Sequence, residues 1–227
     1  MLSIMPLSAS TYAAEIDNLI VLVSVIVGFW FFLVMGVFFW LLWRYRAKEG
    51  VPSQYVTGYD KEQKRFISIP HYLVLVCDIF ILVGAIKVWY NVKQVLPEAE
   101  AEVRVIAQQW AWIFVHPGAD GAFDTDDDIK TVNELHLQKD TVYHYHLQSR
   151  DVLHSFSIPV FRLKQDALPG RTITGWFEPT VAGEFDLQCT EICGVGHALM
   201  PARVFVEDAP THARWIADNS NTELASN

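Results

Sequence analysis

Residues 19–43 form an unbroken run of twenty-five residues without a charged side chain. As an α-helix rising about 1.5 Å per residue, such a run would be roughly 37 Å long, enough to cross a bilayer with some tilt. Tryptophan, tyrosine and arginine gather where the run ends, at Trp43, Arg44 and Tyr45, as is typical of a membrane interface. The alternative, a buried helix of a large soluble core, fits neither the length nor these flanking residues. We therefore predict a transmembrane helix over about residues 19–43.

A second apolar run covers residues 67–89 and contains two charged residues, Asp78 and Lys87. Lys87 lies near the end of the run, where its side chain can reach the lipid headgroups. A carboxylate in the middle of a membrane span is costly, so Asp78 is expected to face protein, water or a partner. We predict a second transmembrane helix over about residues 67–89. Residues 1–93 would then be an N-terminal segment and a two-helix hairpin in contact with membrane lipid.

Lysine and arginine are concentrated between the two runs. The basic residues of this connection are Arg44, Arg46, Lys48, Lys61, Lys64 and Arg65, and no Lys or Arg precedes them. Because basic residues stay on the cytoplasmic or matrix side, both termini are expected on the opposite side. The first residues lack the basic region of a signal peptide, so the first span can serve as its own insertion signal. The sequence predicts a two-pass protein of a bacterial plasma membrane or a mitochondrial inner membrane, with the C-terminal part on the periplasmic or external side.

Residues 94–227 are predicted to form one β domain. Short runs rich in Val, Ile, Thr, Tyr and Phe alternate with turn sequences such as PGADG at residues 117–121. Strands at this spacing are typical of a sandwich or barrel, and the length suits a Greek-key domain with a single core. The acidic run at residues 124–128 is followed by neither the glycine nor the glutamate of an EF-hand loop, so we expect a solvated hairpin there. After Asp208 we expect a short helix and a frayed end.

The predicted β domain is acidic. Residues 94–227 contain nine Lys and Arg against 20 Asp and Glu, a net charge of −11 within a chain whose net charge is −9. Such a surface does not suit nucleic acid or anionic lipid. It would attract a basic partner and raise the rate of encounter with it.

Four side chains of metal-binding type fall within twelve residues: Cys189, Cys193, His197 and Met200. A further candidate, His154, lies upstream of them. Thiolate and thioether ligands favour copper, and imidazole binds it well. Two thiolates four residues apart on one loop can bridge two metal ions, each of which can take one histidine. Zinc could use the cysteines and histidines but gives no role to Met200. A disulfide, which an oxidising compartment permits, would leave the histidines and the methionine unexplained.

Four segments resemble those of one family, subunit 2 of the haem-copper (cytochrome c) oxidases. CTEICGVGHALMP, at residues 189–201, closely resembles its binuclear copper (CuA) loop. DVLHSFSIP resembles the segment that gives that site its first histidine, QDALPGR resembles the turn that abuts the catalytic subunit, and QQWAWIF resembles the aromatic segment. The resemblance covers nearly the whole chain. It implies a membrane-anchored all-β fold, in which a transmembrane hairpin precedes a cupredoxin-like Greek-key β-barrel.

The resemblance also implies a function and a ligand set. The subunit would accept electrons from a cytochrome c at two copper ions and pass them to a haem of subunit 1, where oxygen is reduced to water. The six copper-site positions are His154, Cys189, Glu191, Cys193, His197 and Met200. Both cysteines would bridge the ions, His154 and Met200 would complete one ion, and His197 with the Glu191 carbonyl would complete the other. The Glu191 side chain would reach a magnesium or manganese ion at the boundary with subunit 1.

Further positions take roles from the same resemblance. Trp110 resembles the exposed tryptophan through which electrons enter, and Asp151 resembles an acidic docking residue for the donor. Asp166 and Arg171 would lie against subunit 1 near the haem propionates. Trp112 is expected to be strand packing. Strand alternation predicts that Trp110 and Trp112 lie on one strand with their side chains on one face.

Two departures from the family pattern bear on the function. Arg150 precedes Asp151 where many relatives have an acid, so the donor can dock differently. The second span lacks the glutamate that marks a proton-channel entrance in many relatives, and residues 67–71 read ISIPH there. This absence keeps open a copper-containing subunit of a nitric-oxide reductase of the same superfamily. A copper carrier or assembly factor is a further class, although simple delivery needs no site with two bridging thiolates and two histidines.

Overall fold

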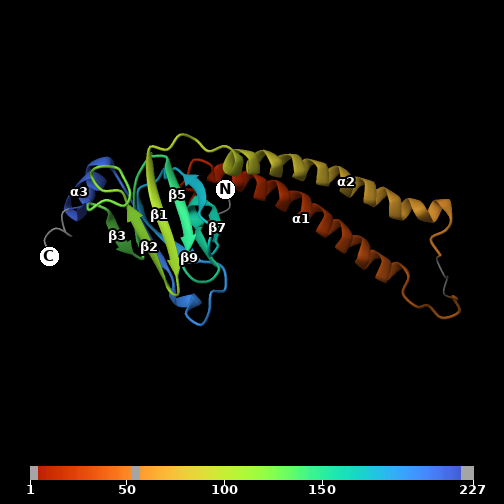
Figure 1. Cartoon of the computed structure of the whole chain (residues 1–227). Coiled ribbons are helices and arrows are strands. Elements are labelled where there is room, and N and C mark those ends of the chain that lie inside the picture. The colour runs from red at the N-terminus through yellow and green to blue at the C-terminus, as the bar shows by residue number, and fades with distance from the viewer. Residues whose placement is uncertain (1–4, 53–56, 221–227) are drawn as a thin grey trace. The chain divides into compact units, whose positions relative to one another are not determined.

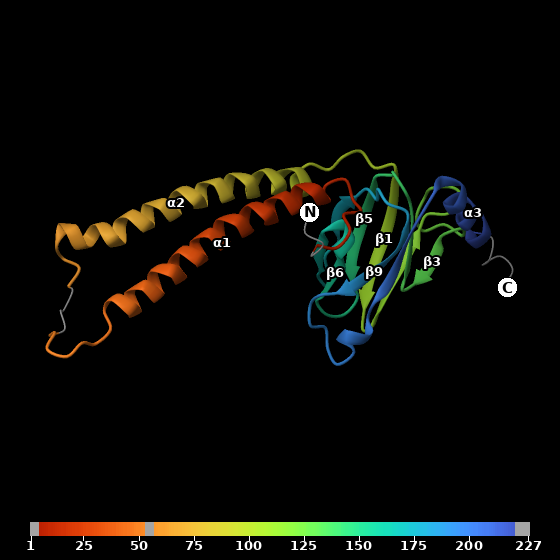
Figure 2. The same cartoon turned by 180° about the vertical axis from the view of Figure 1, so that it is seen from behind.

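The computed structural model describes residues 5–52 and 57–220 of the 227-residue chain. The chain divides into a helical unit, Glu15–Asn91, and a β unit that combines Met1–Ala14 with Val92–Asn227. Figures 1 and 2 show both units from opposite sides. That the segment before the first helix belongs to the β unit was not predicted from the sequence. The predicted frayed end, residues 221–227, lies outside the described residues.

The helical unit consists of two long helices, α1 (Ala13–Arg44) and α2 (Lys61–Trp89), and α2 is followed by the π-helical turn η1 (Tyr90–Gln94). Both predicted spans lie inside these helices, each of which begins several residues earlier because the polar residues before the apolar run are also helical. In the most apolar window of each helix no side chain is buried. Exposed apolar surface of this extent needs an apolar surrounding, so the helices have the properties of membrane spans and not of a soluble core.

Asp78 lies on α2 beside a cavity of about 390 Å³ between the two helices. Apart from Asp78, the lining is almost entirely apolar and includes Trp30 of α1 and Cys77 of α2. The indole Nε1 of Trp30 donates to the Cys77 sulfur at 3.4 Å. That Asp78 faces protein, water or a partner inside the membrane stays a prediction.

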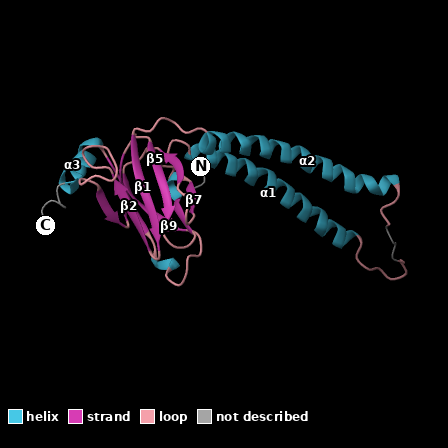
Figure 3. Ribbon diagram, in the orientation of Figure 1, coloured by secondary structure: helices cyan, strands magenta, loops and turns pink. Residues whose placement is uncertain are grey.

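The β unit is a sandwich of two five-stranded sheets (Figure 3). The strand order is β3-β2-β1-β5-β8 in one sheet and β4-β10-β9-β6-β7 in the other. The strands are β1 (Ala101–Gln108), β2 (Ala111–His116), β3 (Ile129–Val132), β4 (Glu134–Gln138), β5 (Tyr143–Ser149), β6 (His154–Ile158), β7 (Leu163–Ala167), β8 (Ile173–Phe177), β9 (Gly183–Cys189) and β10 (Ala202–Glu207). The pairs β1–β5 and β4–β10 are parallel. The predicted β architecture is confirmed.

The core of the β unit lies between the two sheets. Burial alternates along β1, where Val103 and Val105 have no exposed surface, because successive side chains of a strand point to opposite faces. Trp112 of β2 and Phe156 of β6 are fully buried, with ring centroids 5.6 Å apart. These two rings connect the sheets beneath the loop that joins β9 to β10.

The N-terminal segment adds a short extended piece to the β unit. The amide of Ala9 donates to the Val160 carbonyl at 2.8 Å, and the Ala9 carbonyl accepts from the Thr180 amide at 2.9 Å. Ser10 is buried, and its hydroxyl donates to the Phe161 carbonyl at 2.9 Å. These bonds connect the chain just before α1 to residues far apart in the sequence.

The predicted C-terminal helix is α3 (Ala209–Ser220). It is attached through Glu207, whose two carboxylate oxygens lie 3.1 Å from Nδ1 of His136 and 3.1 Å from Nδ1 of His212. Trp215 stacks on His136 at 4.2 Å and meets the edge of His116 at 5.1 Å. Burial, followed by the nearby His212 and His136, lowers the pKa of His116 to about 3. This aromatic cluster was not predicted.

The acidic run lies in the connection between β2 and β3, which pair antiparallel. Asp124 is exposed and accepts two hydrogen bonds from Arg104, at 2.9 and 3.1 Å. Asp128 differs from the expectation of a solvated hairpin because it is buried, and one of its oxygens accepts from the Asp124 amide at 3.0 Å.

Candidate metal centre

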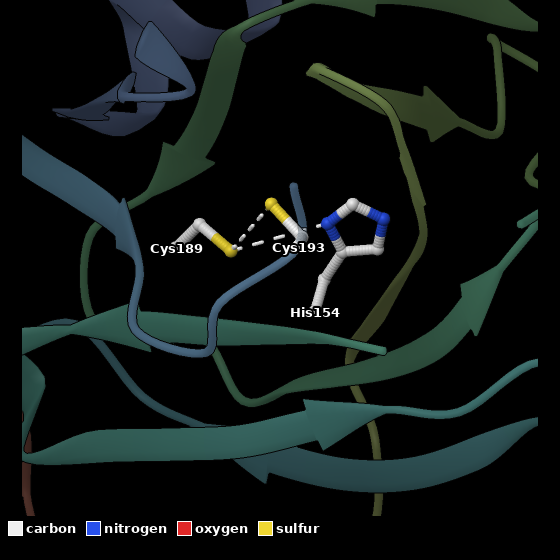
Figure 4. Close-up of side chains that lie close together, drawn as sticks. All are labelled: His154, Cys189 and Cys193. Atoms are coloured by element: carbon white, nitrogen blue, oxygen red, sulfur yellow. Dashed lines mark hydrogen bonds between the residues drawn. The ribbon is translucent and has the colours of Figure 1, made fainter. Parts of the chain in front are cut away.

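The centre is built around two free thiols. The sulfurs of Cys189 and Cys193 lie 3.8 Å apart, and Nδ1 of His154 lies 3.9 Å from the Cys189 sulfur. In Figure 4 the two sulfurs face each other and the imidazole points toward them. Within the described part of the chain, these three residues are the group of His, Cys, Asp and Glu side chains whose donor atoms all lie within 4.8 Å. A sulfur separation of 3.8 Å is far beyond the about 2.05 Å of a disulfide, so the disulfide alternative is not the arrangement seen here.

Strand pairing explains why residues from distant segments meet here. Cys189 is the last residue of β9 and pairs with Phe156 of β6 in the antiparallel register. His154 is the first residue of β6 and lies two positions before Phe156, on the same face of the strand. The imidazole is thereby placed beside the thiol, at the end of the sheet where the β9–β10 loop begins.

The loop at residues 190–201 supplies the remaining donors. Nδ1 of His197 lies 3.6 Å from the Cys193 sulfur, and Sδ of Met200 lies 3.9 Å from it. The carbonyl oxygen of Glu191 lies 3.3 Å from the Cys189 sulfur. The short 3₁₀ helix η3 (His197–Leu199) turns the chain so that His197 and Met200 both face the thiols. All six donors predicted for the metal site therefore converge.

The separations suit metal ions held by these donors. Around a tetrahedral ion with bonds of about 2.0 to 2.3 Å, neighbouring donors lie roughly 3.5 Å apart. The thiol–imidazole and thiol–thioether distances of 3.6 to 3.9 Å are slightly longer, so small side-chain movements would close them. Two thiols, two imidazoles and a thioether are a donor set that favours copper.

Asp151 fixes the orientation of His154. Its Oδ1 lies 2.8 Å from Nε2 of His154, the nitrogen on the far side of the ring from the thiol. Burial alone would raise the pKa of Asp151, but donation by the Gln109 and Val152 amides and by His154 outweighs it and lowers the pKa. An ionised carboxylate at this position keeps the proton on Nε2 and leaves Nδ1 free to bind a metal.

The thiols are shielded from water. Cys193 is 3% exposed and Met200 is 1% exposed, while His154 has no exposed surface. Burial, followed by the neighbouring Cys189 thiol, raises the pKa of Cys193 to about 11. A metal ion bound by this sulfur must therefore displace a proton.

The two tryptophans of the aromatic segment are not on one face of one strand, so this prediction was wrong. Trp110 lies in the turn between β1 and β2 and is 38% exposed, whereas Trp112 lies in β2 and has no exposed surface. The turn interrupts the alternation on which the prediction depended. Trp110 Nε1 donates to the Cys193 carbonyl at 3.3 Å, and Trp112 Nε1 donates to the Met200 carbonyl at 3.2 Å. Trp112 therefore packs in the core, as predicted, and also supports the loop at residues 190–201, which we call the ligand loop because it carries most of the predicted donors.

The residues predicted to face a catalytic subunit lie near the same end of the sandwich. Asp166 of β7 pairs with Ser155, the residue after His154, and is half-buried. Arg171 is exposed in the following turn, where its amide donates to the Leu168 carbonyl at 3.2 Å. The side chain of Glu191 is half-buried. Their roles toward a second subunit and toward magnesium or manganese stay predictions.

One residue that supports the metal centre, Gln109, was not predicted from the sequence. Gln109 holds the ligand loop from the side, because its Nε2 donates to the Cys193 carbonyl at 2.8 Å and its amide donates to Asp151 at 2.6 Å. A glutamine beside two tryptophans has no distinctive spacing, so only the fold brings it to the centre.

Comparison with known proteins agrees with this geometry. A family model described as "Cytochrome C oxidase subunit II, periplasmic domain" matches residues 101–207. The chain is 30% identical over 223 residues to the alternative cytochrome c oxidase subunit 2 of Bradyrhizobium diazoefficiens, covering 88% of this chain and 79% of that protein. It is 28% identical over 254 residues to the cytochrome c oxidase subunit 2 of Cereibacter sphaeroides, covering 96% and 81%.

A solved structure supports the fold. The crystal structure of the periplasmic domain of subunit II of cytochrome oxidase of Bradyrhizobium japonicum matches 56% of this chain and 99% of that chain, with a TM-score of 0.51 and 26% identity. The predicted cupredoxin-like β fold behind two apolar helices is thereby confirmed. The chain belongs to the cytochrome c oxidase subunit II family and is a membrane-anchored subunit of an oxidase complex.

Proposed function

We propose that this chain takes single electrons from a cytochrome c-type donor at a binuclear copper centre. It passes them to a haem of the catalytic subunit, where oxygen is reduced to water. The observation that carries this proposal is the pair of thiols of Cys189 and Cys193, 3.8 Å apart, each with its own imidazole within 3.9 Å. A mononuclear blue-copper site, which takes two imidazoles, one thiolate and a weak axial thioether, would leave one of the two thiols without a role. Bound there, the two copper ions would supply a one-electron redox couple.

The side chains would divide between the two ions as follows. Cys189 and Cys193 would be shared by both, His154 and Met200 would complete one ion, and His197 with the Glu191 carbonyl would complete the other. The burial of the thiols, His154 and Met200 supports this assignment, because a dry and preformed site rearranges little when its charge changes. Asp151, Gln109 and Trp112 would hold these ligands in position.

Trp110 would accept the electron from the donor. Two properties support this role: the side chain is 38% exposed, and its Nε1 is hydrogen-bonded to the Cys193 carbonyl at 3.3 Å. The indole therefore reaches from the surface to the backbone of a copper ligand. Trp112, which is fully buried, has no access to a donor.

The donor would be a basic protein on the periplasmic or external side of the membrane. The net charge of −11 on residues 94–227 supports electrostatic steering of such a partner. Asp151, whose side chain is 31% exposed, would contribute to docking beside Trp110. Val195 of the ligand loop is 96% exposed and would add an apolar contact once the partners meet.

The catalytic subunit would lie against the ligand loop and β7. Glu191 would carry a magnesium or manganese ion at this boundary, with further ligands from the partner, and Asp166 and Arg171 would lie near the haem propionates. Oxygen is proposed as the final acceptor because both relatives are named as cytochrome c oxidase subunits. The nitric-oxide alternative depends on the glutamate missing from the second span, where residues 67–71 read ISIPH.

Rapid mixing of the purified complex with a reduced, soluble cytochrome c tests this order of events. The copper absorption should change first, and haem reduction should follow at a rate independent of donor concentration. Haem reduction that precedes any change at the copper centre would contradict the proposal. Consumption of nitric oxide without consumption of oxygen would favour the alternative acceptor.

A further inference from the structure

Trp110 lies directly on the backbone of the ligand loop. A Cβ atom placed on Gly196 would be 2.4 Å from Cδ2, 2.6 Å from Cγ and 2.8 Å from Cε3 of the Trp110 ring. Non-bonded carbon atoms normally stay about 3.5 to 4.0 Å apart, so the indole occupies the space that any side chain at position 196 would need. Gly196 is buried although the preceding residue, Val195, is 96% exposed.

The backbone itself does not require glycine at this position. Gly196 has φ −91° and ψ 9°, a conformation that other residues adopt in turns. Gly194 differs, because its φ of +117° favours glycine whatever its neighbours are. The reason for a glycine at position 196 is therefore the contact with the Trp110 ring.

This contact holds the indole between two metal ligands of the loop. Gly196 immediately precedes His197, and Trp110 Nε1 donates to the carbonyl of Cys193 at 3.3 Å. A methyl group at position 196 would lift the ring away from the loop and lengthen or break this hydrogen bond. The distance between the indole and the backbone of Cys193, whose bonds continue to the sulfur, would then increase.

We propose that Gly196 is a positioning residue for electron transfer, because its missing side chain allows Trp110 to lie against the ligand loop in contact with Cys193. The proposal rests on the proposed role of Trp110 as the residue that accepts the electron. In the step concerned, the donor haem loses one electron and the oxidised copper pair gains it. No bond forms or breaks and no proton is transferred. Since electron transfer slows steeply as a through-space gap widens, the position of the ring sets the rate.

The test is Gly196→Ala in the full oxidase complex. Copper content and the copper spectrum should stay unchanged, while electron transfer from reduced cytochrome c to copper should slow at least tenfold. Reduction of the same centre by a small photochemical reductant, which does not need Trp110, should keep its rate. Ala182→Ser is the control, since it is an equally small change at an exposed position of the β unit outside residues 190–201 and should leave both rates unchanged.

Combination with Trp110→Ala separates the possible outcomes. If Gly196 acts through the indole, Gly196→Ala adds no further slowing once the indole is gone. Equal rates for Gly196→Ala and wild type, or slowing that multiplies in the double variant, would overturn the proposal. If Trp110→Ala alone has no effect, the proposed role of Trp110 is wrong instead. Should Gly196→Ala lose copper, the double variant should regain it because the ring no longer clashes, and failure to regain it would also overturn the proposal.

Discussion

Oδ1 of Asp151 lies 2.8 Å from Nε2 of His154, on the opposite side of the imidazole from the Cys189 thiol. This relationship adds a second role to a residue that the sequence associated with donor docking. Carboxylate partners of this kind set the tautomer and the ring orientation of a metal-binding histidine. The same carboxylate accepts a hydrogen bond from the Gln109 amide at 2.6 Å, so it also connects His154 to the turn that carries Trp110.

We expect Asp151→Ala to weaken copper retention by about 10- to 100-fold, because His154 loses the partner that orients it. Competition with a copper chelator measures this change. Asp126→Ala is the control, since it removes the same charge at an exposed position of the acidic loop. If Asp151 served only in docking, both variants would keep their copper and only the donor reaction would slow.

The two tryptophans should respond oppositely to truncation. Trp112→Ala removes a fully buried ring and should cost about 3–5 kcal/mol in the free energy of unfolding. Trp110→Ala should leave stability and copper content nearly unchanged, while electron transfer from cytochrome c falls by orders of magnitude. Chemical denaturation and stopped-flow kinetics provide the two measurements. Unfolding or loss of copper in Trp110→Ala would show that this residue is structural.

Electron delivery should depend strongly on ionic strength. The net charge of −11 on residues 94–227 attracts a basic donor over distances that salt shortens, as the Debye length falls from about 30 Å at 0.01 M to about 8 Å at 0.15 M. The second-order rate constant should therefore fall steeply between these concentrations. A rate indifferent to salt would point to a donor held permanently in a larger complex.

The stability of the β unit should fall in acid partly because of His116. Its pKa is about 3 in the folded protein, while an unfolded histidine has a pKa of about 6.5. Between about pH 3 and pH 6.5 the unfolded chain therefore binds one more proton at this position than the folded protein does. The free energy of unfolding therefore falls by about 1.4 kcal/mol for each pH unit below 6.5. The contribution is fully present above pH 6.5.

His116→Leu isolates this contribution because it removes the proton uptake from the unfolded chain. Denaturant unfolding at pH 4, 5 and 6 should give a flatter pH profile for the variant, with the slope reduced by about the amount for one proton. The Nε2 atom of His116 has no hydrogen-bond partner among the described residues, so an apolar replacement breaks no bond at that atom. Parallel pH profiles of variant and wild type would show that His116 is not the group responsible.

The sequence predicted best those features that depend on residues close together in the chain. Residues 19–43 identify a membrane span by themselves, and the loop at residues 190–201 carries most of the donor set. His154, 35 positions before Cys189, could be named from the sequence as a candidate donor, but its position beside the thiols depends on the pairing of β6 with β9. Contacts that depend on the fold were beyond prediction. The turn at Trp110 broke an expected alternation, and the cluster around Trp215 joins residues from β2, β4 and α3.

Metal analysis combined with electron paramagnetic resonance tests the central claim most directly. The intact purified protein should contain two copper ions per chain, and its oxidised form should show one unpaired electron shared equally between them. Cys193→Ser should abolish this shared signal, because one thiolate cannot form the same bridge. A single copper ion, an electron confined to one ion, or zinc at full occupancy would contradict the account.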